Sequence, residues 1–419
     1  MNSANHNFGV IPTPLRLDAN SEYTGKGVTL AFLDSGFYPH PDLITPGNRV
    51  VAYHDVAAER PSLVSTEQTE TWQWHGTQTS VVAAGNGSLS DGLYRGLAHE
   101  SKLVLVKVSE RGRITEENIA RGIKWVIENR ARYDIRVLNV SLGGDEDVPC
   151  SLSIIDQAAE EAIRAGIVVV AAAGNSGERH SIPPANSPSV ITVGGYSDNN
   201  QLDRSQLSLY HSNFGATADG TIKPEIVAPA EWVVAPTFSL EQQIVSELYQ
   251  HVDGTSFAAP IVTSIAAQMI QANPALTPGA IKDILISTAD RIVTEPVVRQ
   301  GYGSVNARRA VELAKTEQHA LNVVGCKPPR VENGTLLFVF HDDYAESVAV
   351  AGDFNGWNHL ARPLTRNSAG LWSTEIVGPQ AGRFEYKFVI DGNRWLEDPS
   401  NGMKTPDTFG GLNSVLLIR

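Results

Sequence analysis

The 419-residue sequence has only two cysteines, Cys150 and Cys326, and they lie far apart. A fold held together by disulfides needs more, so a disulfide framework is excluded, although a single bond between the two stays open. No apolar run reaches the length of a membrane-spanning helix, and the N-terminus lacks the basic start and apolar stretch of a secretory signal. We therefore expect no membrane partner and a cytoplasmic protein, or a secreted one if the chain is a processed form.

Basic residues are scarce as well. Lys and Arg total 33 against 46 Asp and Glu, which gives a formal net charge of -13 at pH 7. A surface this acidic repels phosphate backbones, so nucleic acid is not an expected partner. The remaining composition is that of an ordinary globular protein, and the length predicts two domains. The sequence does not reveal the oligomeric state.

Continuous apolar runs alternate with amphipathic helical patterns over the first three quarters of the chain. The predicted strands are VTLAFLD, LVLVKV, IRVLNVSL, IVVVAAA and VITVGG, and the helical patterns include EENIARGIKWVIENRAR and SIIDQAAEEAIRAG. Continuous apolar runs suit parallel strands that are buried on both faces. The alternation therefore predicts an α/β sandwich around a parallel central sheet.

The pattern changes near residue 319, where a polar stretch with Pro328 and Pro329 predicts a linker. After it come LLFVFHD, SVAVAGDF, LWSTEIV, FEYKFVIDG and SVLLI, separated by turn dipeptides, which predict a small all-β sandwich. We therefore divide the chain into an N-terminal extension, a first domain, a linker and a second domain, at 1–26, 27–318, 319–332 and 333–419.

Four residues of the first domain suit nucleophilic catalysis. A serine hydroxyl becomes a good nucleophile only beside a histidine base that a carboxylate orients. Asp34 ends a predicted strand, His75 opens a helix of small residues, and Ser256 lies at the start of another helix, where Pro260 falls within about the first turn. Asn175 closes a strand, where its amide can donate to an oxyanion. Taken singly, each also suits a structural role as a turn, surface or capping residue.

The blocks DSG, HGT, AAGN and GTSFAAP occur in an order that resembles the subtilisin family, and SNFG and KPEIVAPA resemble further segments of it. The resemblance implies a subtilisin-like three-layer sandwich and a serine endopeptidase that acts on protein or peptide substrates and requires no cofactor. It implies that Ser256 attacks the scissile carbonyl while His75 moves the proton and Asp34 orients His75. Asn175 and the backbone N–H of Ser256 would hold the oxyanion.

The same resemblance implies binding of extended peptide along the segment SLGG, through Ser141, Leu142 and Gly143, and along a facing stretch around Gly112. The arginines beside Gly112 either favour acidic peptide residues or form a solvated turn. Asp42 resembles a calcium-ligand position, but the loop that would complete the site does not match it, so a structural calcium ion stays open. The loop after AAGN looks short, which leaves the preferred substrate side chain open.

The second domain resembles the glycogen-binding module of the AMP-activated kinase β subunit and of starch-branching and debranching enzymes, and so implies an immunoglobulin-like sandwich. Sugar rings stack on aromatic side chains, and polar groups bond their hydroxyls. By this resemblance Trp357 and Trp395 would stack on α-glucan, Lys387 and Asn413 would bind hydroxyls, and Phe409 would reach through the glucan. The alternative is that both tryptophans belong to the core of a structural or protein-docking sandwich.

Two further interpretations of the whole chain stay open. One is a catalytically silent glucan-binding or scaffold protein on a protease fold. The other is an esterase or peptide ligase with the same triad.

Overall fold

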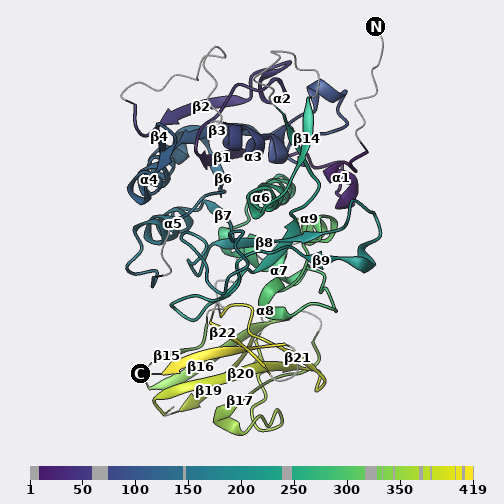
Figure 1. Ribbon diagram of the computed structural model, residues 1–419. Helices are drawn as coiled ribbons and strands as arrows, with labels where there is room; N and C mark the ends of the chain where they lie inside the picture. The colour runs from purple at the N-terminus through teal and green to yellow at the C-terminus, as the bar shows by residue number, and fades with distance from the viewer. Residues whose placement is uncertain are drawn as a thin grey trace. The chain divides into compact units, whose positions relative to one another are not determined.

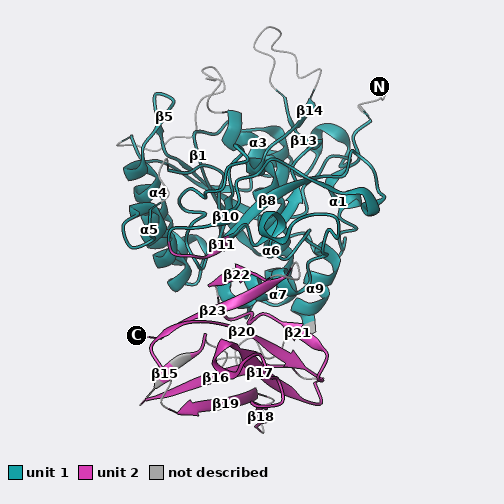
Figure 2. Cartoon of the chain, turned by 60° about the horizontal axis from the view of Figure 1, so that its bottom comes forward, with its two compact units in different colours: residues 1–218, 223–317 teal, residues 219–222, 318–419 magenta. Residues whose placement is uncertain are grey.

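The computed structural model describes residues 9–58, 74–144, 148–237, 248–316, 328–332, 334–342, 345–367, 371–377, 380–401, 403–407 and 411–418. The chain forms two compact units, which are residues 1–218 with 223–317, and residues 219–222 with 318–419 (Figure 2). Cys326 and residues 319–327 of the predicted linker lie outside the described residues. The last three residues assigned to that linker form a strand instead, β15 (Arg330–Glu332).

A parallel sheet forms the centre of the first unit, as the sequence predicts (Figure 1). Its order within the described residues is β12-β8-β7-β6-β1-β3-β2, and β9 pairs antiparallel with β8. The strands are β1 (Thr29–Asp34), β2 (Val50–Asp55), β3 (Lys102–Lys107), β6 (Ile135–Val140), β7 (Val168–Ala172), β8 (Ile191–Ser197), β9 (Ser208–Leu209) and β12 (Ile226–Pro229). Every residue of β1, β7 and β8 is buried, which explains why these strands appear in the sequence as unbroken apolar runs.

Helices cover both faces of this sheet and make three layers (Figure 1). One layer is α4 (Glu116–Tyr133) with α5 (Ile154–Arg164), whose apolar residues join side chains of β1, β3 and β6 in one core cluster. The other contains α3 (Trp74–Ala84), α6 (Thr255–Ala272) and α9 (Ala307–Thr316). Helix α6 contacts β6, β7, β8 and β12 and is buried almost all round, so its sequence carries no polar face.

The remaining elements between residues 9 and 316 are mostly short. They are α1 (Thr13–Arg16), α2 (Pro41–Ile44), η2 (Ser88–Ser90), β4 (Ser109–Glu110), β5 (Arg113–Ile114), η3 (Arg204–Gln206), β10 (Gly215–Ala216), β11 (Ile222–Lys223), β13 (Val233–Pro236), β14 (Tyr249–Val252), α7 (Pro278–Ser287) and α8 (Val297–Gln300). No helix in the described part of the chain combines the length and the apolar character needed to cross a membrane.

The N-terminal segment that the structure describes is fixed to the first unit. Arg16 is buried and pairs through two nitrogens with both carboxylate oxygens of Asp198, each at 2.8 Å. The amide of Ile11 donates to the side chain of Asn200 over 2.8 Å. A bidentate, buried arginine–carboxylate pair is among the stronger polar contacts in proteins. The described part of the predicted extension is therefore an integral part of this unit.

The second unit is an all-β sandwich of two antiparallel sheets, as predicted. One sheet has the order β15-β16-β19-β18, and the other has the order β17-β20-β23-β22, with β21 paired to β20. The bounds are β16 (Thr335–His341), β17 (Val348–Gly352), η4 (Asp353–Asn355), β18 (Thr365–Arg366), β19 (Leu371–Val377), β20 (Gly382–Ile390), β21 (Arg394–Leu396), β22 (Lys404–Pro406) and β23 (Leu412–Ile418). Aromatic side chains fill the space between the sheets, among them Phe338, Trp372, Tyr386 and Phe388.

Candidate active site and carbohydrate pocket

Asp34 and His75 form the hydrogen-bonded pair that the sequence predicts. Asp34 is the last residue of β1 and its side chain is 1% exposed, whereas His75 lies in the first turn of α3 and is 38% exposed. Nδ1 of His75 lies 2.8 Å from Oδ1 of Asp34. The amide of Ser35 donates to the same oxygen, and the hydroxyl of Thr79 donates to the other. These contacts hold the carboxylate in place and leave Nε2 of His75 facing away from it.

Glycine at position 76 makes this approach possible. A Cβ atom added there would lie 2.3 Å from the carbonyl oxygen of Gly36 and 2.8 Å from Cβ of Asp34. Such distances are too short for any side chain, so α3 reaches the end of β1 only because residue 76 has none. The small residue after His75 thus permits the close contact between α3 and the end of β1.

The electrostatics of the pair favour a charged imidazole. Partial burial lowers the pKa of His75, but the charge of Asp34 and its hydrogen bond outweigh burial, so the pKa lies above its ordinary value of 6.5. A carboxylate on Nδ1 also selects the tautomer in which Nε2 is the proton acceptor. The arrangement thus has the properties of a general base oriented by a carboxylate.

Ser256 lies at the second position of α6. The phenyl ring of Phe257, the next residue, is 5.8 Å from the imidazole of His75 between ring centroids. Among the described residues, the hydroxyl of Ser256 makes one long hydrogen bond, 3.4 Å to the carbonyl oxygen of Ser141. The hydroxyl is therefore held only loosely at the N-terminal end of an 18-residue helix, where the helix dipole favours negative charge.

Pro260 is not within the first turn of α6, contrary to the sequence prediction, but is the sixth residue of the helix. A proline has no N–H, so it cannot donate to the carbonyl oxygen four residues earlier, that of Ser256. The hydroxyl of Ser141 donates to that oxygen instead, over 2.9 Å. The position of the proline is thus compatible with the helix because a side chain of the neighbouring segment replaces the missing donor.

Asn175 lies three residues beyond the end of β7 rather than at the strand end itself. Its Oδ1 accepts hydrogen bonds from both the amide and the hydroxyl of Thr255, each at 2.9 Å. Because Oδ1 is the acceptor, the orientation of the side chain is determined and Nδ2 is the group available for donation. Thr255 directly precedes Ser256, so the side-chain amide of Asn175 is held against the residue next to the candidate nucleophile.

The predicted peptide-binding residues lie on two segments of the first unit. Strand β6 ends at Val140, so Ser141, Leu142 and Gly143 follow the strand, and the last two are half-buried. Gly112 lies in the two-residue turn between β4 and β5, and its φ of +81° is the left-handed conformation that suits a hairpin turn. The predicted pairing with peptide stays a prediction.

Asp42 is fully buried and its carboxylate is already bonded within the protein. The hydroxyl of Tyr249 donates to Oδ2 over 2.6 Å, and the hydroxyl of Ser88 and the amide of Leu89 donate to Oδ1 over 3.0 and 3.2 Å. Calcium needs six to eight oxygen ligands with accessible lone pairs. Donors that point at both oxygens of Asp42 do not fit such an ion. Within the described residues, no group of three acidic, His or Cys side chains is arranged to hold a metal.

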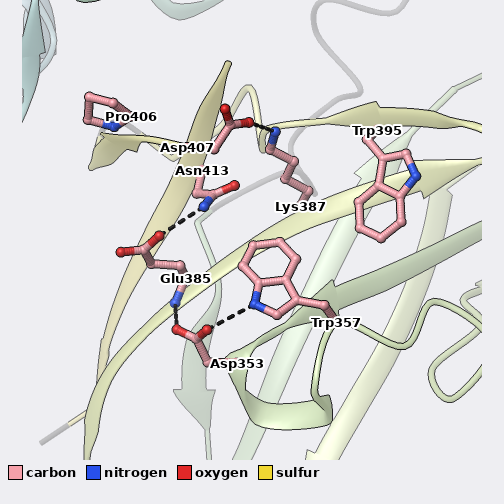
Figure 3. Close-up of a pocket in the computed structure, with 8 residues that line it drawn as sticks. All are labelled: Asp353, Trp357, Glu385, Lys387, Trp395, Pro406, Asp407 and Asn413. Carbon is pink, nitrogen blue, oxygen red and sulfur yellow. Dashed lines mark hydrogen bonds and ion pairs between the residues drawn. The ribbon is translucent and has the colours of Figure 1, made fainter. Parts of the chain in front are cut away.

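The second unit contains a cavity of about 720 Å³ (Figure 3). Its lining residues are Asp353, Trp357, Glu385, Lys387, Trp395, Pro406, Asp407 and Asn413. Four of the five predicted carbohydrate-binding residues are therefore brought together. The fifth, Phe409, lies outside the described residues.

The two tryptophans form an aromatic platform in this cavity. Their ring centroids are 6.4 Å apart with an interplanar angle of 32°, and Trp395 is 41% exposed. Trp357 has a φ of +61°, a rare conformation for a bulky residue, and Nε1 of its indole donates to Asp353 over 3.0 Å. Backbone strain of this kind is typical of functional sites. The indole rings line an open cavity, whereas Trp372 is the tryptophan of the core.

Polar side chains of the cavity are paired with carboxylates (Figure 3). Nζ of Lys387 binds Asp407, and the side-chain amide of Asn413 donates to Glu385 over 2.8 Å. Glu385 and Lys387 are two residues apart on β20, so their side chains lie on the same face of the sheet. The cavity therefore offers both hydrogen-bond donors and acceptors beside an aromatic surface, which is the chemistry of a sugar site.

Sequence reasoning missed the carboxylates Asp353, Glu385 and Asp407. Glu385 could have been found from the two-residue period that places it beside Lys387. Asp407 has no such signal, because it meets Lys387 only through the pairing of β22 with β23 and of β23 with β20. In the active site Thr79 and Thr255 were missed too, although both are one helical turn or less from a predicted catalytic residue.

Comparison with known proteins relates each part of the chain to a known family. A family model described as "Subtilase family" matches residues 25–304, and a model described as "Carbohydrate-binding module 48 (Isoamylase N-terminal domain)" matches residues 324–406. Serine protease AprX of Bacillus subtilis (strain 168) is 36% identical over 312 residues, which cover 69% of this chain and 67% of that protein. Subtilisin BL of Lederbergia lenta is 32% identical over 293 residues, with 70% of this chain and 93% of that protein covered.

The fold comparison gives the same result. The solved structure of a protease from Pseudoalteromonas arctica PAMC 21717 matches with a TM-score of 0.56 at 26% identity, and the match covers 73% of this chain and 94% of that one. The match thus extends over nearly the whole length of the solved protein.

Proposed function

We propose that this chain, which belongs to the subtilase family and is a subtilisin-like serine endopeptidase, uses Asp34, His75 and Ser256 as its triad and is held on α-glucan by its C-terminal unit. The observation that carries the catalytic part is the 2.8 Å contact between Nδ1 of His75 and Asp34. Ser256 is near the start of a buried helix, and the ring of the next residue, Phe257, lies 5.8 Å from the imidazole of His75. A family model of a carbohydrate-binding module matches residues 324–406. We propose that α-glucan is the carbohydrate it binds.

The steps of peptide hydrolysis follow from this geometry. Rotation of the Ser256 side chain replaces its long contact with Ser141 by one with Nε2 of His75. His75 then takes the hydroxyl proton as Ser256 attacks the scissile carbonyl carbon, and Asp34 stabilises the imidazolium that forms. The carbonyl oxygen becomes an oxyanion and accepts hydrogen bonds from Nδ2 of Asn175 and the backbone amide of Ser256. His75 returns the proton to the leaving amine. A water molecule then gives a proton to His75 as it attacks the acyl carbon, and His75 passes that proton to Ser256 as the acid product leaves.

Tethering to glucan gives the second unit its role. A chain bound to a polymer meets other proteins on that polymer at a raised effective concentration. The observation in favour is the pair of indoles, one exposed (Trp395) and one half-buried (Trp357), that line a cavity whose polar groups include Lys387 and Asn413. No cofactor is part of this mechanism. We also propose that calcium is not bound at Asp42, since protein donors already bond both of its carboxylate oxygens.

The catalytic proposal is tested with a serine-reactive fluorophosphonate probe on the full-length protein. We expect the wild type to be labelled and Ser256→Ala to remain unlabelled, with cleavage of a casein substrate lost in parallel. In subtilisin itself, loss of the nucleophilic serine costs about 10⁶-fold in kcat. Folded wild-type protein that fails to react would contradict an active triad and favour a silent scaffold.

The tethering proposal is tested by co-sedimentation with glycogen. We expect the wild type to sediment and Trp357→Ala and Trp395→Ala each to remain largely in solution, because each change removes a stacking surface. For scale, stacking of a nucleic-acid base on one aromatic side chain is worth about 1–3 kcal/mol. Trp372→Phe, a change in the core of the same unit, is the matched control and should still sediment. Equal sedimentation of all four proteins, or of none, would contradict glucan binding at this cavity.

A further inference from the structure

The oxyanion residue Asn175 lies on a segment that has no regular secondary structure, so something must hold it in place. The segment SNFG, which resembles a family block, provides the contacts. Asn213 of this segment is buried, with 3% of its surface exposed. It bonds both chain neighbours of Asn175 but not Asn175 itself.

Three hydrogen bonds make up this clamp. The amide of Asn213 donates to the carbonyl oxygen of Gly174 over 3.0 Å. Its side-chain Oδ1 accepts from the amide of Ser176 over 2.8 Å and from the hydroxyl of Ser176 over 2.7 Å. One side chain and its backbone thus fix the residue before Asn175 and the residue after it.

The fit around Gly174 shows how close the contact is. Gly174 has a φ of +104°, and a Cβ atom added there would lie 2.7 Å from Nδ2 of Asn213. Only glycine suits this position, both for its backbone conformation and for the space that Asn213 occupies. Glycine in the AAGN block therefore leaves the space that the Asn213 side chain occupies.

The clamp is itself anchored to rigid elements. Ser212, next to Asn213, accepts a hydrogen bond from the amide of Gly195 in β8 over 2.7 Å. On the other side, the hydroxyl of Thr255 in α6 accepts from the amide of Gly174 over 3.2 Å. The loop that carries Asn175 is thus connected to the central sheet through Asn213 and to the nucleophile helix through Thr255.

We infer that Asn213 is a positioning residue for the oxyanion hole: it holds Gly174 and Ser176 so that Nδ2 of Asn175 points at the carbonyl oxygen of the transition state. The inference rests on the oxyanion role proposed for Asn175. A preorganised donor stabilises the oxyanion only while it stays in place, and a displacement of about 1 Å can cost 10²-fold in rate. The loss should fall on kcat, because substrate in its ground state needs this donor less.

The test is a double-mutant cycle in the full-length protein with a peptide p-nitroanilide substrate. For scale, loss of the corresponding amide in subtilisin lowers kcat by about 10²–10³-fold. We expect Asn213→Ala to lower kcat by about 10- to 100-fold with KM changed by less than about threefold. In the Asn175→Ala background the same substitution should lower kcat by less than about threefold, because there is no donor left to position.

Controls separate positioning from general damage. Ser176→Ala removes one of the two bonds to Oδ1 and keeps the amide donor, so its loss in kcat should be clearly smaller than that of Asn213→Ala. Asn213→Ser, whose side chain stays polar but is too short to place an acceptor where Oδ1 lies, replaces the alanine variant if that variant does not fold. Equal losses in both backgrounds, or a loss confined to KM, would overturn the inference. If Asn175→Ala itself leaves kcat unchanged, the oxyanion role of Asn175 fails instead.

Discussion

The hydroxyl of Ser141 donates to the main-chain carbonyl oxygen of Ser256 over 2.9 Å, in the place where a helical N–H would donate if residue 260 were not proline. The carbonyl oxygen of Ser141 in turn lies 3.4 Å from the hydroxyl of Ser256. The two serines therefore bond each other in both directions. The proline makes this possible, since it leaves the Ser256 carbonyl without a helical partner and so open to a side chain from the segment after β6.

We predict that Ser141→Ala destabilises the protein by about 1–2 kcal/mol, because it leaves the Ser256 carbonyl without a donor. The effect should depend on the proline. In a Pro260→Ala background the alanine N–H can donate to that carbonyl, so Ser141→Ala should cost about 1 kcal/mol less. Urea unfolding of the four proteins measures the coupling. Equal costs in the two backgrounds would show that Ser141 does not substitute for the missing N–H.

The raised pKa of His75 predicts the acid side of the pH profile. Burial lowers the pKa, and the charge and hydrogen bond of Asp34 raise it further than burial lowers it. The neutral imidazole is the active form, so kcat/KM should rise with pH around a midpoint above 6.5. Asp34→Asn should move the midpoint down and lower kcat by about 10⁴-fold. A wild-type midpoint at or below that of the Asn variant would contradict the pairing.

The same shift has a consequence for stability. A group whose pKa is raised by folding stabilises the folded state fully below its unfolded pKa, and this contribution is lost as the pH rises through the folded pKa. Asp34 and His75 should therefore stabilise the fold most in mildly acidic solution. Comparison of the unfolding free energy of the wild type and His75→Ala between pH 5 and pH 9 tests this, and a difference that grows with pH would run against it.

Much of the first unit could be predicted because its central strands are buried on both faces. β1, β3, β6, β7 and β8 all appear in the sequence as predominantly apolar runs. Strand β2 was missed, since it lies at the edge of the sheet and most of its residues are only partly buried. Strand β12 was missed as well, since it has four residues and ends in Pro229. Edge position and short length remove the signal that central strands carry.

The candidate sites show the same distinction between local and distant information. Asp34, His75, Ser256 and Asn175 each belong to a short block, so the sequence alone was enough to find them. The partner of Asp42 could not be found, because Tyr249 lies 207 positions away and the contact depends on the whole fold. The sequence suggested that Asp42 could bind a calcium ion, whereas in the structure its carboxylate accepts a hydrogen bond from the hydroxyl of Tyr249.

Tyr249 should therefore matter for stability where calcium does not. Burial and the charge of Asp42 raise the pKa of Tyr249 well above its ordinary value, so its hydroxyl stays protonated and keeps donating. We expect EDTA to leave the melting temperature unchanged, and Tyr249→Phe to lower the unfolding free energy by about 1.5–3 kcal/mol. Tyr53→Phe is the control, because the Tyr53 hydroxyl is buried without a hydrogen-bond partner among the described residues and its removal should cost little. A melting temperature that falls in EDTA and recovers with calcium would contradict this account.

The charges of the carbohydrate cavity predict which glycans it excludes. Three carboxylates and one ammonium line it, and the ammonium of Lys387 is held by Asp407, whose other oxygen accepts from the amide of Gly411 over 2.6 Å. Lys387 is thus neutralised, and the net negative charge repels anionic polymers, most strongly at low ionic strength. We expect glycogen to bind and sulfated dextran not to bind.

Substitution of Asp407 tests whether this pair sets the preference. Asp407→Ala removes one negative charge and leaves Lys387 unpaired, so binding of sulfated dextran at low ionic strength should rise while glycogen binding falls only modestly. Trp395→Ala is the matched control: it should weaken glycogen binding without any gain for the sulfated polymer. Affinity electrophoresis in gels that contain either polymer measures both. If both polymers retard the wild type equally, the cavity does not discriminate against anionic glycans, although it still binds glucan. If Asp407→Ala binds sulfated dextran no better than the wild type does, Asp407 does not restrain Lys387 from binding the sulfate groups.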